Sequence, residues 1–414
     1  MTDVFCVLPY NSLSLDGPGR PRLCCNNHGH WEDYSQPFVN DCAEPLDVLN
    51  SQLHKAVRLS IQAGERHPTC SKCWKIEDTG GVSFRQIWND VYTKDGVTPV
   101  AKPIAADGTL LQGAEIQYLD ITFGNKCNLV CRMCNWMNSH LWQNDLAKLG
   151  RWESVEADPR SAHQIWFEDP GAIELINRSL PSVTHMNFLG GEPLIVKQHM
   201  DILQSCIDQG LSQHQQISYN TNLTHVPTKL LEMWQSFQWV NINVSIEAVG
   251  IANDYIRQNS DWRIISHNLQ RIAALQAPNI KLELHTTFGI YNCFNVAELI
   301  EWTEQQQCFA DLPFVNIVYQ PTYQDVRLLP EYAKHEIRVE IEQALAGYEN
   351  QRNYSSWQGA LNYMDNAATD MVIYNFKDWP DDAWQQFWHD ADQLDQLKSR
   401  NMQDYLPRLA RLRP

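Results

Sequence analysis

The sequence lacks any uninterrupted apolar run of the length that a membrane span needs, and its first nine residues show no basic region followed by an apolar core. Positive charge is also scarce, because 32 lysines and arginines stand against 49 aspartates and glutamates, a formal net charge of -17. This balance disfavours nonspecific binding to DNA, RNA or anionic lipid, while leaving room for a local basic cleft. We therefore expect a soluble, cytoplasmic protein without a nucleic-acid or membrane partner.

Cysteine is plentiful, with 12 cysteines in 414 residues. Many cysteines in a short secreted chain would indicate a disulfide scaffold, but here they are spread through a long chain without an export signal. Ligation of metal by thiolates is therefore the better general explanation.

Three of the cysteines, Cys127, Cys131 and Cys134, share one short loop that follows an apolar run. Three thiolates can hold three irons of a four-iron cluster and leave the fourth iron open to a substrate or cofactor. A structural zinc site is the alternative, since zinc takes four nitrogen or sulfur ligands and His140 lies nearby. An open iron indicates an enzyme, because a fully ligated cluster mostly carries electrons.

The chain divides into four predicted parts. Residues 1–90 have little helical or strand periodicity apart from one helix near 45–63, and residues 91–114 are predicted to be a linker or mobile loop. Residues 115–320 alternate β-rich runs with helical patterns, and residues 321–414 are mainly helical.

Six β-rich runs are predicted strands: 116–123, 183–189, 216–219, 240–246, 281–288 and 314–319. Between them lie five predicted helices: 139–148, 196–209, 228–235, 262–275 and 296–307. This alternation predicts parallel strands joined by right-handed crossovers, as an open barrel or a doubly wound sheet. In both folds ligands bind at the carboxyl ends of the strands, where the cysteine loop follows the first one.

Polar groups follow the second and third predicted strands. Gly190 and Gly191 allow backbone to approach a ligand closely, and Glu192 offers an acceptor for an ammonium group. Asn220 and Asn222 can hydrogen-bond sugar hydroxyls, although such residues are also ordinary turn formers.

The fourth predicted strand ends near Ser245, and Arg257 follows it. An arginine can grip a carboxylate with two nitrogens, although a lone arginine is usually a solvated surface residue. Taken together, the groups at these strand ends match an amino acid that bears a ribose: an amine, a carboxylate and sugar hydroxyls each have a partner.

Residues 115–320 resemble the radical S-adenosylmethionine (radical SAM) enzymes. The resemblance rests on the C-x-x-x-C-x-x-C signature and the Gly-Gly-Glu motif, with the following matching positions: Cys127, Cys131, Cys134, Met133, Gly190, Gly191, Glu192, Asn220, Asn222, Ser245 and Arg257. It implies an α/β fold with a six-unit partial β/α barrel. It also implies that Met133 contacts adenine, Asn220 or Asn222 the ribose, and Ser245 and Arg257 the methionine carboxylate.

The resemblance further implies a mechanism. S-adenosylmethionine would chelate the open iron of a 4Fe-4S cluster, and one electron from a flavodoxin- or ferredoxin-type donor would cleave it to methionine and a 5'-deoxyadenosyl radical. That radical would remove a hydrogen from the substrate, while the protein orients the reactants and excludes solvent.

Cysteines in the first part of the chain resemble the four-cysteine twitch form of the SPASM module. The resemblance rests on the spacing of Cys6, Gly19 and Cys24 and on the later pair Cys70 and Cys73. It implies a second, auxiliary 4Fe-4S cluster held by the four thiolates. The order differs from the usual one, because twitch modules follow the barrel.

Several cysteine assignments stay open. A zinc knuckle is the alternative to the auxiliary cluster, Cys25 competes with Cys24 as a ligand, and Cys42 is unassigned. Three other cysteines are expected to be buried apolar fillers: Cys206, Cys293 and Cys308.

Similar SPASM and twitch proteins often modify peptides, so the favoured substrate is a peptide or protein side chain. Dehydrogenation or rearrangement of a small metabolite is the competing enzymatic hypothesis. A non-catalytic iron-sulfur electron carrier or zinc-stabilised binding protein is the third, although a carrier would not need Glu192 and Arg257 beside an open iron.

Overall fold

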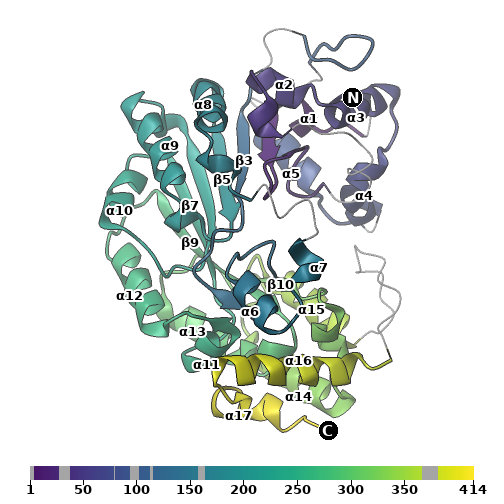
Figure 1. The fold of residues 1–414 in the computed structure, drawn as a ribbon, viewed down its shortest axis with the longest axis vertical. Helices are drawn as coiled ribbons and strands as arrows, with labels where there is room; N and C mark the ends of the chain where they lie inside the picture. Colours follow the sequence, from purple (N-terminus) through teal and green to yellow (C-terminus); the bar gives the residue numbers. More distant parts are fainter. Residues whose placement is uncertain are drawn as a thin grey trace. The chain divides into compact units, whose positions relative to one another are not determined.

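The computed structural model describes residues 4–27, 38–78, 80–93, 102–111, 115–156, 164–365 and 381–414. The fold is mixed α/β, with an eight-stranded, mostly parallel sheet and a helical C-terminal region (Figure 1). The predicted linker at 91–114 falls partly outside the described residues.

All six predicted strands are present: β3 (Tyr118–Phe123), β5 (His185–Gly190), β6 (Gln216–Thr221), β7 (Trp239–Ser245), β9 (Ile280–Phe288) and β10 (Phe314–Ile317). In the strand order β10-β9-β7-β6-β5-β3-β1-β2 these six lie beside one another in chain order. A doubly wound sheet would reverse its order at a switch point. The observed order is that of the predicted six-unit partial β/α barrel.

The first part of the chain has more regular structure than its weak sequence periodicity indicates. The sheet is extended there by β1 (Ser12–Leu15), which runs parallel to β3, and by β2 (Pro21–Arg22). The side chain of Ser14 donates a hydrogen bond to Asp120, and Asn187 donates to the other Asp120 oxygen. Asp120 is buried, and burial raises its pKa. One buried carboxyl thus connects three adjacent strands.

Helices precede the barrel as well. The predicted helix at 45–63 is two helices, α2 (Pro45–Leu49) and α3 (Gln52–Ala63), separated by Asn50 and Ser51. Three more were not predicted: α1 (Leu8–Asn11), α4 (Ser71–Asp78) and α5 (Phe84–Val91).

In the barrel, five helices match the predicted ones: α6 (Trp142–Lys148), α9 (Lys197–Asp208), α10 (Thr228–Trp234), α12 (Trp262–Ala273) and α13 (Val296–Gln306). Three others were not predicted: α7 (Glu153–Glu156), α8 (Pro170–Ser179) and α11 (Ile251–Ile256). The C-terminal region consists of α14 (Glu331–Ala344), α15 (Tyr354–Asp365), α16 (Ala383–Lys398), α17 (Met402–Tyr405) and α18 (Pro407–Ala410). Cys206 in α9 and Cys293 are fully buried, as predicted, whereas Cys308 is half-buried.

The chain forms two compact units. The first comprises residues 1–126, 156–219 and 232–240, and the second comprises residues 127–155, 220–231 and 241–414. The predicted division into four parts remains a prediction. No helix within the described ranges has both the length and the apolar character needed to cross a bilayer.

Two buried histidines predict acid sensitivity. Burial lowers the pKa of His54 and of His199 to about 3, with Arg58 adding to the effect at His54. Both histidines are therefore neutral in the folded chain, but they bind a proton in the unfolded chain below its pKa of about 6.5. Stability is complete above that value and falls as the pH drops towards 3. Each histidine contributes a slope of about 1.4 kcal/mol per pH unit.

We expect the free energy of unfolding, measured with urea, to decrease between pH 7 and pH 5. The variant His199→Gln should remove one histidine's share of that slope, whereas His214→Gln, at an exposed position, should leave the slope unchanged. Equal slopes in wild type and His199→Gln would contradict the assignment.

Candidate functional site

The cysteine triplet lies in a loop that follows β3 and contains the short strand β4 (Val130–Cys131). Cys127 and Cys131 are buried, Cys134 is half-buried, and the three pack together with Leu129. The backbone N–H of Leu129 donates to the Cys127 sulfur at 3.4 Å. The three side chains predicted to act together are thus gathered in one small cluster.

Arg257 is placed opposite the triplet by a two-residue antiparallel ladder. The strand β8 (Arg257–Gln258) pairs with β4, so that Cys131 faces Arg257. The N–H of Arg132 extends the contact by donating to the carbonyl of Ile256 at 2.8 Å. The backbone therefore joins the cysteine loop directly to the arginine predicted to bind a carboxylate.

Arg257 has a second partner that the sequence analysis did not assign. Its Nη1 donates to Glu247 at 2.8 Å, and Glu247 also accepts from Thr286 and from the backbone of Thr287. Burial acts to lower the pKa of Arg257, but Cys131 and Glu247 face it and raise that pKa above its ordinary value. The Nε of Arg257 is buried without a hydrogen-bond partner among the described residues. A buried cation with a spare donor suits an anionic ligand.

Burial also controls the thiols. It raises the pKa of Cys131 to about 12 and that of Cys134 to about 11, while Arg257 acts in the opposite direction on both. A bound metal would supply the positive charge that lets such buried thiols ionise, with release of protons.

Arg132, between the second and third cysteines, anchors the loop. It is buried, its Nη2 lies 2.5 Å from Asp395 in α16, and its Nε donates to the carbonyl of Tyr255. Its guanidinium stacks 3.8 Å from the centre of the Tyr255 ring. The side-chain amide of Gln324 donates to the Arg132 carbonyl at 2.9 Å. The loop that carries the triplet is therefore fixed to the C-terminal helices.

The two asparagines after β6 have different roles. Asn222 is buried, and its amide donates to Asn128 inside the cysteine loop while its oxygen accepts from Thr224. Asn220 is exposed and accepts from Asn243. Asn222 thus supports the cysteine loop, and Asn220 is the one accessible to a ligand. Ser245, the last residue of β7, is half-buried.

This difference gives a matched prediction. Asn222→Ala removes the donor to the side-chain oxygen of Asn128 and the acceptor for the N–H and hydroxyl of Thr224, at a cost of about 1–3 kcal/mol of unfolding free energy. Asn220→Ala, at an exposed position, should change stability by less than about 0.5 kcal/mol. Urea unfolding of the two variants measures both. Equal losses would contradict the supporting role of Asn222.

The Gly-Gly-Glu motif is packed against backbone. A Cβ on Gly190, whose φ is +130°, would lie 2.9 Å from Phe123 backbone atoms, and one on Gly191 would lie 2.5 Å from the carbonyl oxygen of Lys126. The N–H of Glu192 donates to that same carbonyl at 2.9 Å. The glycines let the chain segment just before Cys127 come close, and the close approach of a ligand that the sequence analysis expects of them stays a prediction.

The Glu192 carboxylate is buried and accepts from the N–H of Leu194 at 3.1 Å. Met133 is half-buried and packs on the cysteine cluster.

A cavity of about 350 Å³ adjoins Cys134. Its lining includes aromatic side chains and an ion pair: Trp136, Trp142, Tyr323, Arg151 and Asp390. Its size falls in the usual range for small-ligand sites.

His140, the residue that could complete a zinc set, is exposed and accepts the N–H of Cys127 at its Nδ1. Within the described ranges, no three histidine, cysteine, aspartate or glutamate side chains form a ready-made metal-ion site. The cysteine side chains would therefore have to turn towards a metal group as it binds.

A second cysteine site lies in the first unit. Four cysteines line one pocket: Cys6, Cys24, Cys70 and Cys73. Cys70 ends the short helix η3 (Pro68–Cys70), and Cys73 lies one turn further on, in α4. Burial, followed by the charge of Cys73, raises the pKa of Cys70 to about 12. The segment that contains Cys6 and Cys24 thus meets the segment that contains Cys70 and Cys73 at one pocket, and these are the segments predicted to act together.

Cys25 does not line this pocket. Its electrostatic neighbours are Asp120, Arg22 and Lys72, whereas those of Cys24 are Cys25 and the other three pocket cysteines. These neighbours favour Cys24 over Cys25 as a ligand.

Cys42, which the sequence analysis leaves unassigned, is half-buried, and its sulfur lies 3.6 Å from the carbonyl of Phe38.

The four-cysteine pocket also contains polar atoms suited to a bound group. Asn27 lines the pocket and is 2% exposed, yet neither amide atom has a hydrogen-bond partner among the described residues. The hydroxyl of Thr69, fully buried on the same wall, also lacks one. Buried polar atoms nearly always have partners, and the sulfurs of an iron-sulfur cluster accept hydrogen bonds. The pocket residues therefore fit the predicted auxiliary cluster.

Sequence reasoning missed Glu247, Arg132, Asn27 and Thr69. Only Glu247 had a signal, since it lies two residues beyond Ser245, just after the end of the same strand. The others acquire their roles from partners distant in the sequence.

No family model and no curated protein matches this chain. It is similar to the solved structure of Streptococcus suis SuiB bound to S-adenosylmethionine, with 13% identity over 56% of this chain and 47% of SuiB, and a TM-score of 0.36. It is also similar to native anSMEcpe with bound AdoMet, with 9% identity over 59% of this chain and 62% of that one, and a TM-score of 0.37.

A third similar structure is TYW1 with a lysine-pyruvate adduct bound, with 11% identity over 52% of this chain and 70% of TYW1, and a TM-score of 0.30. This chain spans about half of SuiB and just under two thirds of anSMEcpe. Similarity at this level does not assign a family, so function has to be argued from the residues of the chain itself.

Proposed function

We propose that this chain is a radical SAM enzyme with a catalytic and an auxiliary 4Fe-4S cluster. The observation that carries the proposal is the β4–β8 ladder, which sets Arg257 opposite Cys131 in a loop with three clustered cysteines. A structural zinc site or a simple electron carrier would have no need of a buried, partly unpaired cation facing its ligands.

In this proposal Cys127, Cys131 and Cys134 hold three irons of the catalytic cluster. The residues that would bind S-adenosylmethionine are those the sequence predicts: Glu192 for the amine, Ser245 and Arg257 for the carboxylate, Asn220 or Asn222 for the ribose, and Met133 for adenine. Asn220 is the better ribose candidate because Asn222 is already bonded to Asn128. When bound, the reduced cluster supplies the electron that cleaves S-adenosylmethionine and generates a hydrogen-abstracting radical.

The chain's own residues orient and desolvate this site. Glu247 holds Arg257 by one nitrogen and leaves its Nε available to a carboxylate. Because Glu247 balances the charge, the buried guanidinium needs no solvent to stabilise it before the ligand arrives. Arg132 and Asn222 fix the loop from two sides.

The auxiliary cluster is assigned to Cys6, Cys24, Cys70 and Cys73. Four thiolates leave no iron open, so this cluster would carry electrons, stabilise the fold, or both. The side-chain amide of Asn27 and the hydroxyl of Thr69, which lack hydrogen-bond partners within the described ranges, line the same pocket as the thiols and support a bound group there.

We further propose a peptide or protein side chain as the substrate, a flavodoxin- or ferredoxin-type electron donor, and a cytoplasmic location. The cavity beside Cys134, with its aromatic and charged lining, has the size to admit one or two side chains. A gene for a short precursor peptide beside the gene for this chain would favour this substrate over a small metabolite.

The test of the radical SAM assignment is anaerobic reconstitution with iron and sulfide, followed by addition of dithionite and S-adenosylmethionine. We expect about eight irons per chain and formation of 5'-deoxyadenosine. Iron-loaded protein that forms no 5'-deoxyadenosine, or zinc in place of iron, would overturn the proposal.

A further inference from the structure

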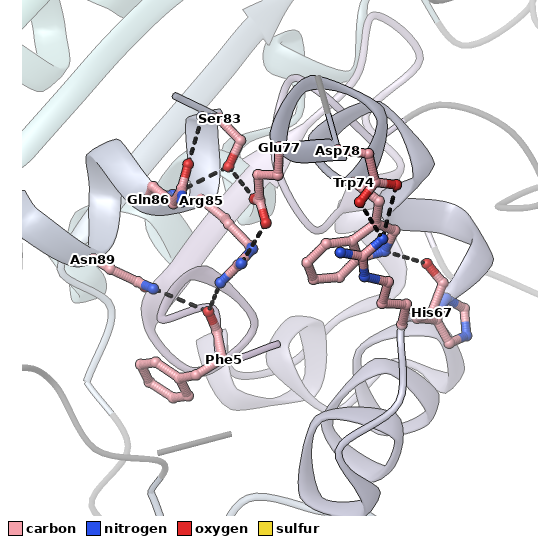
Figure 2. Close-up of polar contacts among 10 residues, drawn as sticks. Phe5, His67, Trp74, Glu77, Asp78, Ser83, Arg85, Gln86 and Asn89 are labelled. Atoms are coloured by element: carbon pink, nitrogen blue, oxygen red, sulfur yellow. Dashed lines mark hydrogen bonds and ion pairs between the residues drawn. The ribbon is translucent and has the colours of Figure 1, made fainter. Parts of the chain in front are cut away.

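The backbone on both sides of Cys6 is held by α5. The side-chain amide of Asn89 donates to the carbonyl of Phe5 at 2.9 Å, and its oxygen accepts the N–H of Val7 at 2.9 Å. Nη1 of Arg85 donates to the same Phe5 carbonyl at 2.7 Å. Figure 2 shows Arg85 and Asn89 converging on Phe5 from one helix. The peptide groups that flank Cys6 are therefore fixed.

Arg85 also brings a buried charge to the four-cysteine pocket. It lines that pocket, and its Nη2 lies 2.5 Å from Glu77, with both side chains about one-tenth exposed. Its guanidinium lies 4.7 Å from the centre of the Trp74 ring, and Ser83 donates a hydrogen bond to Glu77 at 2.5 Å. Both members of the pair are thus held in place, as Figure 2 shows.

Arg85 lies close to the pocket thiols. It lines the same pocket as Cys6 and Cys70, and its Nη1 is bonded to the carbonyl of Phe5, the residue next to Cys6. Arg85 is therefore a buried cation at the wall of the site that the four candidate ligands line.

A four-thiolate cluster becomes more negative by one charge when it accepts one electron. A nearby cation stabilises that reduced form and a nearby anion destabilises it, and both effects are strong where water is excluded. Arg85 in the pocket wall and Glu77, paired with it at 2.5 Å, therefore have opposing influences that can be removed separately.

We propose that Arg85 and Glu77 tune the reduction potential of the auxiliary cluster, with Arg85 raising it and Glu77 lowering it, while Asn89 positions Cys6. This inference rests on the auxiliary cluster of the proposed function. The step is a one-electron reduction of the cluster by dithionite, with no bond formed or broken. Arg85 acts through charge and position and has no direct part in the chemistry of the substrate.

The experiment uses the full chain with Cys127, Cys131 and Cys134 all replaced by alanine, so that only the auxiliary cluster remains. After reconstitution, iron is counted and the cluster is titrated with dithionite, with its reduced form monitored by electron paramagnetic resonance. Arg85→Gln should lower the reduction equilibrium constant about tenfold, a shift of about 59 mV. Glu77→Gln should raise the potential by a similar amount. Arg85→Lys, which keeps the charge, should stay closest to the parent.

Opposite shifts distinguish tuning from a merely structural role, because general damage would move both variants the same way. Potentials that shift in the same direction, or that do not move while iron content is full, would overturn the inference and leave the auxiliary cluster intact. If Arg85→Gln does not bind iron, Glu77→Gln decides, and an unchanged or lowered potential there overturns the inference. Absence of iron from the parent would instead overturn the auxiliary cluster itself.

Discussion

Cys131→Ala should reduce 5'-deoxyadenosine formation to the level of a no-enzyme control. Cys131 is buried in the cluster of three cysteines and stands opposite Arg257 in the β4–β8 ladder. Two remaining thiolates cannot hold a four-iron cluster with a single open iron, so the electron source next to S-adenosylmethionine would be lost. The measurement is chromatography of the anaerobic reaction with dithionite and S-adenosylmethionine.

The matched control is Cys206→Ala, which removes another buried thiol, in α9. It should retain both iron and product formation, apart from a modest loss of stability. Product formation that survives in Cys131→Ala would refute the assignment of the triplet.

The neighbouring cysteines Cys24 and Cys25 should differ sharply when replaced. Cys24 lines the four-cysteine pocket and lies within electrostatic reach of Cys6, Cys70 and Cys73, whereas Cys25 faces Asp120. Cys24→Ala should therefore reduce the iron content from about eight to about four per chain, and Cys25→Ala should leave it at about eight. Iron and sulfide assays on the reconstituted variants measure this difference.

Because the two substitutions are adjacent, each acts as the control for the other. A loss of iron in Cys25→Ala alone would reverse the ligand assignment. Four irons in the wild type would instead dismiss the auxiliary cluster.

Much of the barrel was predictable because its strands are short apolar runs separated by amphipathic helices. All six predicted strands occur, with ends shifted by a few residues at most. The N-terminal strand β1 was missed although Ser12, Leu13, Ser14 and Leu15 alternate with the period of a strand. Four residues are a weak signal alone, and β1 is stabilised by pairing with β3, more than 100 residues away.

The candidate site was predictable where chemistry depends on spacing within one segment. The cysteine triplet and the Gly-Gly-Glu motif are of this kind. Pairings between distant segments were not predictable: Glu247 with Arg257, Asn222 with Asn128, and Arg132 with Asp395 each depend on how the chain folds. The glycines of the motif let two backbone segments pack closely against each other. This role also depends on the fold, so spacing alone does not reveal it.

The bond between Arg132 and Asp395 has a consequence for the timing of assembly. Its two residues are 263 positions apart, and Asp395 lies in α16. During synthesis, the cysteine loop would therefore leave the ribosome long before the helix that secures it. The loop with the thiols would lack this anchor until α16 folds, because contacts at such sequence separation form late. We therefore expect iron to be inserted only after α16 has been synthesised and has folded.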